Sequence, residues 1–404
     1  MEMKKKMEVI NGKIDCKPEE TGYDSSRIIA LNSHFERLIN EKMILGAVYT
    51  IRHKGKIIAN GALGNASRGK NFKQMLPNTV FGVASITKIF TTVAILQLIE
   101  DGFLRLDSFV SDFLTQFKKE PFNNIQIIHL LTHTSGLYPD GGCLSNCEYE
   151  DAFDLVHKAI KNWDGKSDFD WITPALACGV KCEPGKEWMY YSFGFVILGA
   201  VIKKITGIFG NTYLEDKIMK PLKMNDSAFN PIPIKDIAKR IFVWDEDMEQ
   251  LVNDLASGKE IPQEKSTWER LEIPSTGGGF WSTTNDLSNF GQMLLNFGRL
   301  AGQRILGRKI IEKATSYTLK NVSNNCWGAN EPDRDYGIGF DMKTGPAFTY
   351  SKGTYMHEGS GTCSIDIDPK EQLIATWFTP WVDPNFWAPE PLFNVQNIIW
   401  SGLI

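Results

Sequence analysis

A serine and a lysine three residues apart, Ser85 and Lys88, are the residues of this chain whose types and spacing most directly suggest chemistry. Residues at this spacing lie on the same face of a helix, one turn apart. An ammonium removed from water loses hydration, which favours its neutral form and turns lysine into a base near neutral pH. A hydroxyl beside such a base is the minimum for nucleophilic catalysis. The alternative is that Ser85 only caps a helix and that the Lys88 ammonium reaches solvent.

The element that must position this pair is a helix predicted over residues 85–99, which is apolar almost all round. A helix without a continuous polar stripe is usually buried, so Lys88 is expected as a single formal charge inside a core. At the N-terminus of this helix, Ser85 would lie where free backbone N–H groups favour a developing anion.

Two other stretches carry residues that a serine and lysine pair needs as partners. Tyr190 and Ser192 come directly before a second apolar helix, predicted over residues 193–205. A phenol beside an ammonium can become a phenolate, because a nearby opposite charge favours the charged form. His357 lies in a predicted strand, where the following glycines let a substrate approach the backbone closely. Each residue alone is more often part of a core.

Taken together, the motifs resemble the serine β-lactamase and penicillin-binding-protein superfamily. Ser85-Ile-Thr-Lys88, Tyr190-Tyr-Ser192 and His357-Glu-Gly359 match its S-x-x-K, Y-x-N and H/K-x-G motifs in order and approximate spacing. The class C β-lactamases, the D-alanyl-D-alanine carboxypeptidases, the D-aminopeptidases and related esterases are the most similar members. Residues 129–137, 221–224 and 277–283 also resemble this family, and the resemblance runs from about residue 25 to residue 380.

The resemblance implies a two-lobed α/β fold, in which an antiparallel sheet flanked by helices is joined to an inserted all-helical lobe, with the catalytic cleft between them. We expect residues 1–80 and 272–404 to form the sheet lobe and residues 81–271 the helical lobe. Hydrophobic periodicity predicts helices over residues 25–44, 149–163 and 391–400, and another that starts near residue 282. It predicts strands over residues 47–51, 57–61, 336–342, 362–367 and 373–378. Residues 139–188 show little periodicity and are expected to form a long functional loop.

The resemblance also implies a role for each motif residue. Ser85 would be the acylated nucleophile, with Lys88 assisting its deprotonation. Tyr190 would act as general base and then protonate the leaving group, and His357 would hold the Tyr190 proton network. The backbone N–H groups of Ser85 and Ser360 would form the oxyanion hole.

Two residues depart from the motifs and narrow the expected substrate. Ser192 stands where the family has asparagine and would hydrogen-bond Lys88 or the substrate amide, which weakens the case for an efficient β-lactamase. Glu358, beside Gly359 in the substrate-binding motif, would repel a substrate carboxylate about 5 Å away by about 3 kcal/mol. We therefore expect an esterase, a D-amino-acid peptidase or an amidase. The alternatives are a β-lactamase or D-Ala-D-Ala carboxypeptidase, and a penicillin-recognising protein that binds without turnover.

Composition limits the other classes of function. The 404 residues carry a formal net charge of −4 and no basic stripe, which argues against nucleic acid as a partner. The N-terminal segment is too polar for a signal peptide, and the apolar runs are shorter than the ~20 residues of a membrane span. We therefore expect a cytoplasmic protein that acts on a small molecule or a short peptide without a metal or cofactor. The seven cysteines are expected to be reduced; a four-ligand site of Cys143, Cys147, Cys178 and Cys182 is the less favoured alternative.

Overall fold

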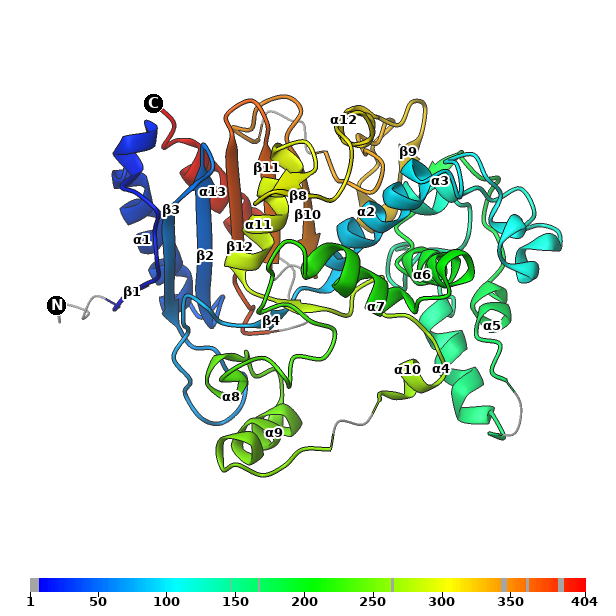
Figure 1. Cartoon of the computed structure of the whole chain (residues 1–404), viewed down its shortest axis with the longest axis horizontal. Coiled ribbons are helices and arrows are strands. Elements are labelled where there is room, and N and C mark those ends of the chain that lie inside the picture. The colour runs from blue at the N-terminus through cyan, green and yellow to red at the C-terminus, as the bar shows by residue number, and fades with distance from the viewer. Residues whose placement is uncertain are drawn as a thin grey trace.

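A six-stranded antiparallel sheet, in the order β1-β3-β2-β12-β11-β10, unites the two ends of the chain (Figure 1). The computed structural model describes residues 7–145, 147–165, 168–262, 265–342, 347–360, 363–383 and 389–404, without the side chains of residues 389–393. The strands of this sheet are β1 (Ile10–Asn11), β2 (Gly46–His53), β3 (Lys56–Gly64), β10 (Tyr355–Gly359), β11 (Cys363–Asp368) and β12 (Leu373–Phe378). The expected fold class, with an antiparallel sheet built from both ends of the chain, is confirmed.

Alternating side chains give this sheet two covered faces. Tyr49 and Ile51 of β2 belong to the hydrophobic cluster with α1 (Ser26–Asn40) and α13 (Pro389–Trp400), whereas Val48 belongs to the main core. On the main-core face, Gly291 of α11 (Thr284–Leu295) lies against Ile374 and Ile367 of the sheet. The sheet is therefore sandwiched, with α1 and α13 on one face and α11 on the other (Figure 1).

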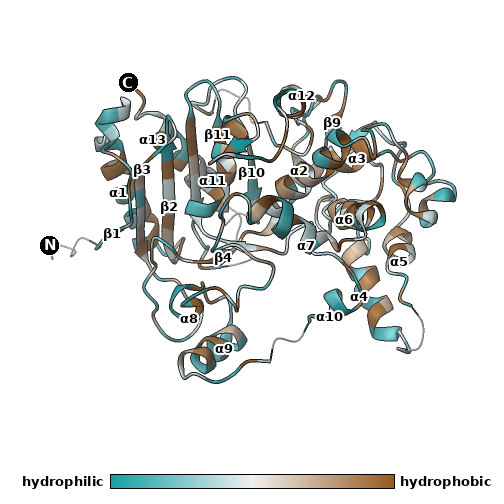
Figure 2. Ribbon diagram, in the orientation of Figure 1, coloured by the Kyte–Doolittle hydropathy of each residue, from teal (hydrophilic) through white to brown (hydrophobic). Residues whose placement is uncertain are grey.

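The segments between β3 and β10 are mainly helical. The helices are α2 (Thr87–Glu100), α3 (Ile127–Leu131), α4 (Ala152–Asn162), α5 (Ile172–Leu176), α6 (Phe193–Thr206), α7 (Gly210–Leu214), α8 (Ile237–Arg240), α9 (Glu246–Ala256), α10 (Thr267–Arg270) and α12 (Arg308–Ser316). Three short strand pairs join them: β4 (Phe81–Gly82) with β6 (Trp281–Ser282), β5 (Glu187–Trp188) with β9 (Ser323–Asn324), and β7 (Arg299–Leu300) with β8 (Gln303–Arg304). Figure 2 shows the apolar residues concentrated on the sheet strands and on α2 and α6.

The two apolar helices that the sequence predicts form the centre of this helical part. Every side chain of α2 from Thr87 to Leu96 is buried, and α2 packs against α6. Phe90 of α2 also stacks on Phe290 of α11 with ring centroids 3.8 Å apart, so one core joins the helices to the sheet. The division of the chain into two lobes at residues 81 and 272 stays a prediction.

The strand predicted over residues 336–342 is wrong. Only an isolated bridge joins Tyr336 to Asp341, because Gly339 has a φ of +75° that breaks the extended backbone. A side chain at Gly339 would collide with Thr92 of α2, so the glycine permits a close approach between the two segments. Thr362, where another strand was expected to start, lies outside the described residues, and β11 is described from Cys363.

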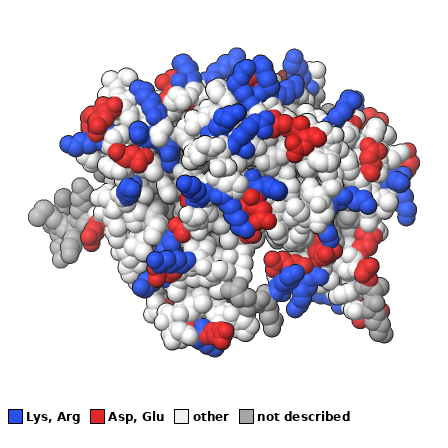
Figure 3. Space-filling model, in the orientation of Figure 1, with Lys and Arg blue, Asp and Glu red and all other residues white. Residues whose placement is uncertain are grey.

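In the described part of the chain, no single helix is both long and apolar enough to cross a membrane. The segments Phe193–Thr206 and Gly210–Met219 would reach that length only as a pair, and they meet at a bend of 79°. Lysine and arginine side chains are interspersed with acidic ones over the face seen in Figure 3.

Candidate active site

Ser85 lies in a strained turn at the start of α2. A 3₁₀ turn (Ala84–Ile86) follows the short strand β4, and Ala84 adopts a left-handed φ of +45°. Such a conformation is costly for a residue other than glycine and persists where surrounding contacts hold it. The turn leaves Ser85 partly exposed, while the helix that follows is buried.

Lys88 is fully buried, and its ammonium group meets the serine directly. Nζ lies 2.8 Å from Oγ of Ser85 and donates to the carbonyl oxygen of Gly277 at 2.7 Å. Loss of hydration lowers the pKa of Lys88 to about 7, and the nearby Asp140 carboxylate opposes this shift. The alternative of a helix-capping serine with a solvent-exposed lysine is therefore wrong, because the Lys88 side chain has no exposure to solvent.

Tyr190 completes the group around Ser85. Nζ of Lys88 lies 5.0 Å from the centroid of the Tyr190 ring, and Ser85 hydrogen-bonds the phenol. Burial raises the pKa of Tyr190, and the hydrogen bond to Ser85 lowers it by less. Burial thus favours the protonated phenol over the phenolate that a neighbouring ammonium can produce, and Lys88, rather than Tyr190, loses its proton near neutral pH.

Asp140 is a member of the site that sequence reasoning missed. Its Oδ1 accepts the backbone N–H of Ser192 at 2.7 Å, and its own N–H donates to the carbonyl oxygen of Tyr190 at 2.9 Å. Burial raises the pKa of Asp140, whereas the charge of Lys88 lowers it. A single residue thus holds the Tyr190 and Ser192 segment, through its backbone N–H and its carboxylate, and its charge acts on Lys88. The Ser192 hydroxyl hydrogen-bonds Asp140 and Tyr190, and a bond from Ser192 to Lys88 or to a substrate amide stays a prediction.

His133, from the stretch 129–137 that resembles the family, packs against the tyrosine. Its ring stacks on Tyr190 with centroids 4.4 Å apart, and Nδ1 accepts the backbone N–H of Tyr191 at 3.0 Å. Burial lowers the pKa of His133 well below its usual value, and the charge of Lys88 lowers it further. His133 is therefore a neutral ring that supports Tyr190. Its family motif was visible in the sequence, but nothing in the motif indicated this contact.

The side chains of His357 and Glu358 point to opposite faces of strand β10. His357 pairs with Ile365, on the α11 face, and interacts electrostatically with His133. Its Nδ1–H donates to the carbonyl oxygen of Glu358 at 2.7 Å. Glu358 pairs with Ser364, and the Ser364 hydroxyl bonds to Asp366, a residue held by Gln396 of α13.

The prediction that Glu358 repels a substrate carboxylate is therefore wrong. Successive side chains of a strand point to opposite sides, so Glu358 lies on the α13 face when His357 lies on the face toward Ser85. Its charge raises the pKa of Tyr350, another residue on that far face.

The other proposed oxyanion-hole residue, Ser360, borders a cavity beside the nucleophile. A cavity of about 470 Å³ is lined by Ala84, Ser360, Gly278, Trp281 and Arg68 among others. Gly359 brings β10 so close to the turn before Ser85 that a Cβ would lie 2.3 Å from the carbonyl oxygen of Val83. Ser360 has a left-handed φ of +40°, like Ala84 on the other side of the cavity. The assignment of the Ser85 and Ser360 N–H groups as an oxyanion hole stays a prediction.

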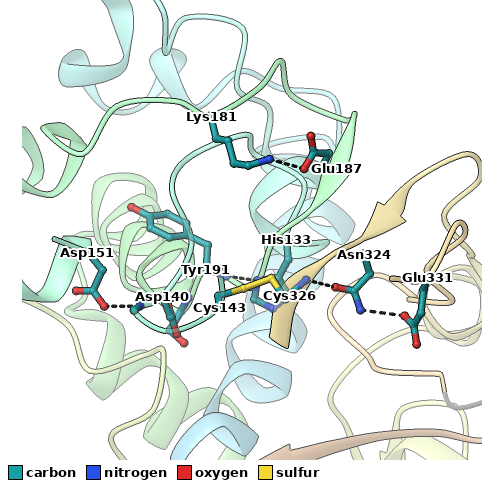
Figure 4. Close-up of a disulfide and its surroundings, with 12 residues drawn as sticks. His133, Asp140, Cys143, Asp151, Lys181, Glu187, Tyr191, Asn324, Cys326 and Glu331 are labelled. Atoms are coloured by element: carbon teal, nitrogen blue, oxygen red, sulfur yellow. Dashed lines mark hydrogen bonds and ion pairs between the residues drawn. A yellow bond between two sulfur atoms is a disulfide. The ribbon is translucent and has the colours of Figure 1, made fainter. Parts of the chain in front are cut away.

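A disulfide joins two loops beside these residues (Figure 4). Cys143, three residues after Asp140, is bonded to Cys326, which lies 183 residues further along the chain. The expectation that all seven cysteines are reduced is therefore wrong for this pair, because folding brings the two sulfur atoms together. Cys143 is consequently not available as a metal ligand with Cys147, Cys178 and Cys182. In the described residues, no three histidine, cysteine or acidic side chains gather into a metal site.

Comparison with known proteins places these residues in a family. The family model described as Beta-lactamase matches residues 31–391. Esterase EstB of Burkholderia gladioli is 30% identical over 227 residues, which cover 52% of this chain and 54% of the esterase, about half the length of each. N-acetylmuramyl-L-alanine amidase of Bacillus subtilis is 25% identical over 84% of this chain and 79% of the amidase. The octameric penicillin-binding protein homologue of Pyrococcus abyssi has a similar structure, with a TM-score of 0.65 at 23% identity, over 93% of this chain and 76% of that one.

Proposed function

We propose a hydrolytic function for this chain from the premise that it belongs to the beta-lactamase family. Its activity would be that of a serine hydrolase, in which an ester or amide acylates Ser85 and water then releases the acid. The names of its relatives, an esterase and an amidase, agree with this class of reaction. The observation that carries the proposal is the 2.8 Å contact between the fully buried Lys88 amine and the Ser85 hydroxyl.

The geometry supports a division of labour between the two proton carriers. Neutral Lys88 accepts the Ser85 proton as Oγ attacks the carbonyl carbon, while an N–H of the amine keeps its bond to Gly277. Tyr190, protonated in the resting site, gives its proton to the oxygen or nitrogen of the leaving group as the bond to the acyl carbon breaks. A proton then passes from the Lys88 ammonium to the Tyr190 phenolate, so the pair is ready for the attack of water on the acyl-enzyme.

The oxyanion formed during the attack would lie in the cavity between Ala84 and Ser360. Backbone N–H groups of Ser85 and Ser360 would donate to it, and loss of one such donor typically costs ~10² to 10³ in rate. His357 would hold the Tyr190 proton network, and it interacts electrostatically with His133, whose ring stacks on Tyr190.

One observation favours substrates with a carboxylate as a second candidate class. Arg68 lines the cavity that contains Ser360, and its guanidinium lies 5.4 Å from the centre of the Trp244 ring. Because Glu358 points to the other face of the sheet, Arg68 is the charge that an acyl group in this cavity would meet. A hydrolase for esters or amides whose acyl group carries a carboxylate therefore stands beside an esterase for neutral acyl groups as a proposed activity.

The test combines covalent labelling with turnover. We expect a fluorophosphonate probe to label the wild-type chain and not Ser85→Ala, and short-chain p-nitrophenyl esters to be hydrolysed by the wild type only. Labelling that survives Ser85→Ala would contradict the nucleophile assignment. Labelling without turnover of any ester, D-amino-acid amide or β-lactam would instead identify a binding protein. An Arg68→Gln variant that loses activity only on substrates with a carboxylate would select the second candidate class.

A further inference from the structure

One exposed aromatic residue lies beside Tyr190, with its ring tilted against the phenol. Trp327 keeps 60% of its surface exposed, and its ring centroid lies 5.4 Å from that of Tyr190 and 6.4 Å from that of Trp188. Trp188 and Tyr190 belong to a buried cluster, but most of the indole of Trp327 faces solvent. Ligand sites are lined mainly by apolar and aromatic side chains beside a few polar groups, and an exposed indole next to the Tyr190 phenol matches such a lining.

The backbone of Trp327 is held in place from several sides. Its N–H donates to the carbonyl oxygen of Cys143 at 2.8 Å, and the neighbouring Cys326 is bonded to the same residue (Figure 4). The N–H of Cys326 donates to Oδ1 of Asn324 at 2.9 Å, and Asn324 belongs to β9, which pairs with β5 immediately before Tyr190. The segment that carries the indole is therefore tied to the segment that carries the phenol.

These ties hold Trp327 in a conformation that it would not otherwise favour. Its φ is +53°, in the left-handed region that costs free energy for any residue except glycine. Such strain persists only where the surroundings impose it, and it occurs preferentially at functional sites. Ala84, His133 and Ser360 have the same kind of backbone, so four strained residues gather around the reaction centre.

We propose that Trp327 is a specificity-determining residue that stacks on the leaving group of the substrate and favours aromatic leaving groups. The inference rests on the proposed function, in which the Tyr190 phenol protonates the leaving group. The leaving atom then lies within hydrogen-bond distance of that phenol. An indole packed beside the same phenol presents its free face to whatever is attached to the leaving atom. Aromatic pairs attract beyond their buried area, so an aryl alcohol or arylamine gains from this contact more than an alkyl one.

The experiment compares two activated esters that form the same acetyl-enzyme, phenyl acetate and 2,2,2-trifluoroethyl acetate. A difference between the two leaving groups changes kcat/KM, because kcat/KM reports the steps up to loss of the leaving group. We expect Trp327→Ala to lower the ratio of the phenyl to the trifluoroethyl value about tenfold. Trp327→Phe should restore most of that ratio, because it keeps an aromatic face. Equal losses on both esters, or no loss, would overturn the proposal.

Two controls separate a specific effect from a general one. Phe297 is 51% exposed and has a φ of +52°, but it has no ring contact with the site in the described residues, so Phe297→Ala should leave the ratio unchanged. The double variant Cys143→Ser/Cys326→Ser should lower the ratio in the same direction as Trp327→Ala but less, because it removes one of the ties. A double variant that matches the wild type would show that the disulfide does not position the indole.

The acyl group provides an internal check. Phenyl acetate and phenyl butyrate share a leaving group, so Trp327→Ala should reduce kcat/KM for both esters by the same factor. A loss that grows with the length of the acyl chain would place the indole beside the acyl group and overturn the assignment. A failure of the proposed function would give another result, because the Ser85→Ala variant would then keep its esterase activity. If Ser85→Ala is inactive and Trp327→Ala leaves the ratio unchanged, only the present inference fails.

Discussion

Two lysines in different parts of the molecule have lost much of their hydration, and only one of them faces a nucleophile. Burial lowers the pKa of Lys88 to about 7 and that of Lys73, in the loop after β3, to about 8. Nζ of Lys88 meets the Ser85 hydroxyl and one carbonyl oxygen. Among the described residues, Nζ of Lys73 donates only to the carbonyl oxygens of Ala238 and Ile241, and it ties its loop to the α8 segment.

The difference shows what desolvation alone does and does not provide. Removal of water makes an amine available as a base at either position, but a base needs a proton to accept. At Lys73 all the described partners are acceptors, so the amine serves as a donor that joins two segments. At Lys88 one partner carries a proton whose loss creates a nucleophile. The neighbours of the lysine, rather than its pKa, therefore separate a catalytic lysine from a structural one.

The largest expected effect comes from removing the amine at the catalytic position. Lys88→Met keeps the length of the side chain and leaves Ser85 without a base. We expect kcat/KM for p-nitrophenyl acetate to fall about 10³-fold, within the range of general-base contributions. Steady-state kinetics on the variant, with thermal unfolding measured in parallel, checks this. A loss of less than tenfold would mean that Tyr190, not Lys88, deprotonates the serine.

The same substitution at the structural position should act on stability instead. Lys73→Met leaves two carbonyl oxygens without their donor, and we expect the free energy of unfolding to fall by about 1 to 2 kcal/mol. Activity at a temperature where the variant is folded should stay within about twofold of the wild type, since general-base losses do not arise here. Urea unfolding and ester hydrolysis measure the two quantities. A large fall in kcat/KM without a fall in stability would remove the contrast between the two lysines.

A smaller effect should follow from changing the charge beside Lys88. The titratable and charged groups that interact with Lys88 are Asp140, Tyr190 and His133, which stays neutral. In the proposed mechanism the neutral form of Lys88 is the active one, so kcat/KM in the wild type should rise with pH through about 7. Asp140→Asn removes the anion that raises the pKa of Lys88, while its amide oxygen can still accept the Ser192 N–H.

The rise in kcat/KM should therefore move to lower pH in Asp140→Asn, and the rate on the acid side of the rise should increase roughly threefold. The pH profile from 5 to 9 is the measurement, with the plateau above the rise as the internal reference. Movement of the rise to higher pH would contradict the assignment of Lys88 as the base. A uniform loss at all pH values would mean that Asp140 acts only by holding the backbone of Ser192.

The parts of the fold that hydrophobic pattern determines could be predicted from the sequence. The strand predicted over residues 373–378 is β12 with the same bounds, and the helix predicted over residues 193–205 is α6 to within one residue. Length separates the two cases, because a short apolar run fits a buried strand and a longer one fits a buried helix. The failure at residues 336–342 has the opposite cause, since a glycine there serves an approach to α2 rather than a strand.

Some residues of the candidate site could likewise be predicted from the sequence, and others could not. Ser85, Lys88 and Tyr190 could be found because their partners lie one helical turn away or inside a recognisable motif. Asp140 could not, because its role depends on a loop folding back onto Ser192, 52 residues later in the chain. Cys143 and Cys326 were likewise too far apart to pair by spacing. The direction of the Glu358 side chain was predicted wrongly, because the face on which a side chain lies depends on the register of its strand. β10 acquires that register only by pairing with β11.

The order of strands in the central sheet bears on when the protein can become active during its synthesis. β2, near the start of the chain, pairs with β12, so Val48 lies opposite Phe378. Contacts between residues so far apart along the chain slow folding, because a long loop must close before they form. The ribosome completes the segment with Ser85 and Lys88 well before it reaches His357 and Ser360. A nascent chain thus carries the proposed nucleophile without the strand that completes the candidate site, so the proposed hydrolysis would begin only after the sheet has closed.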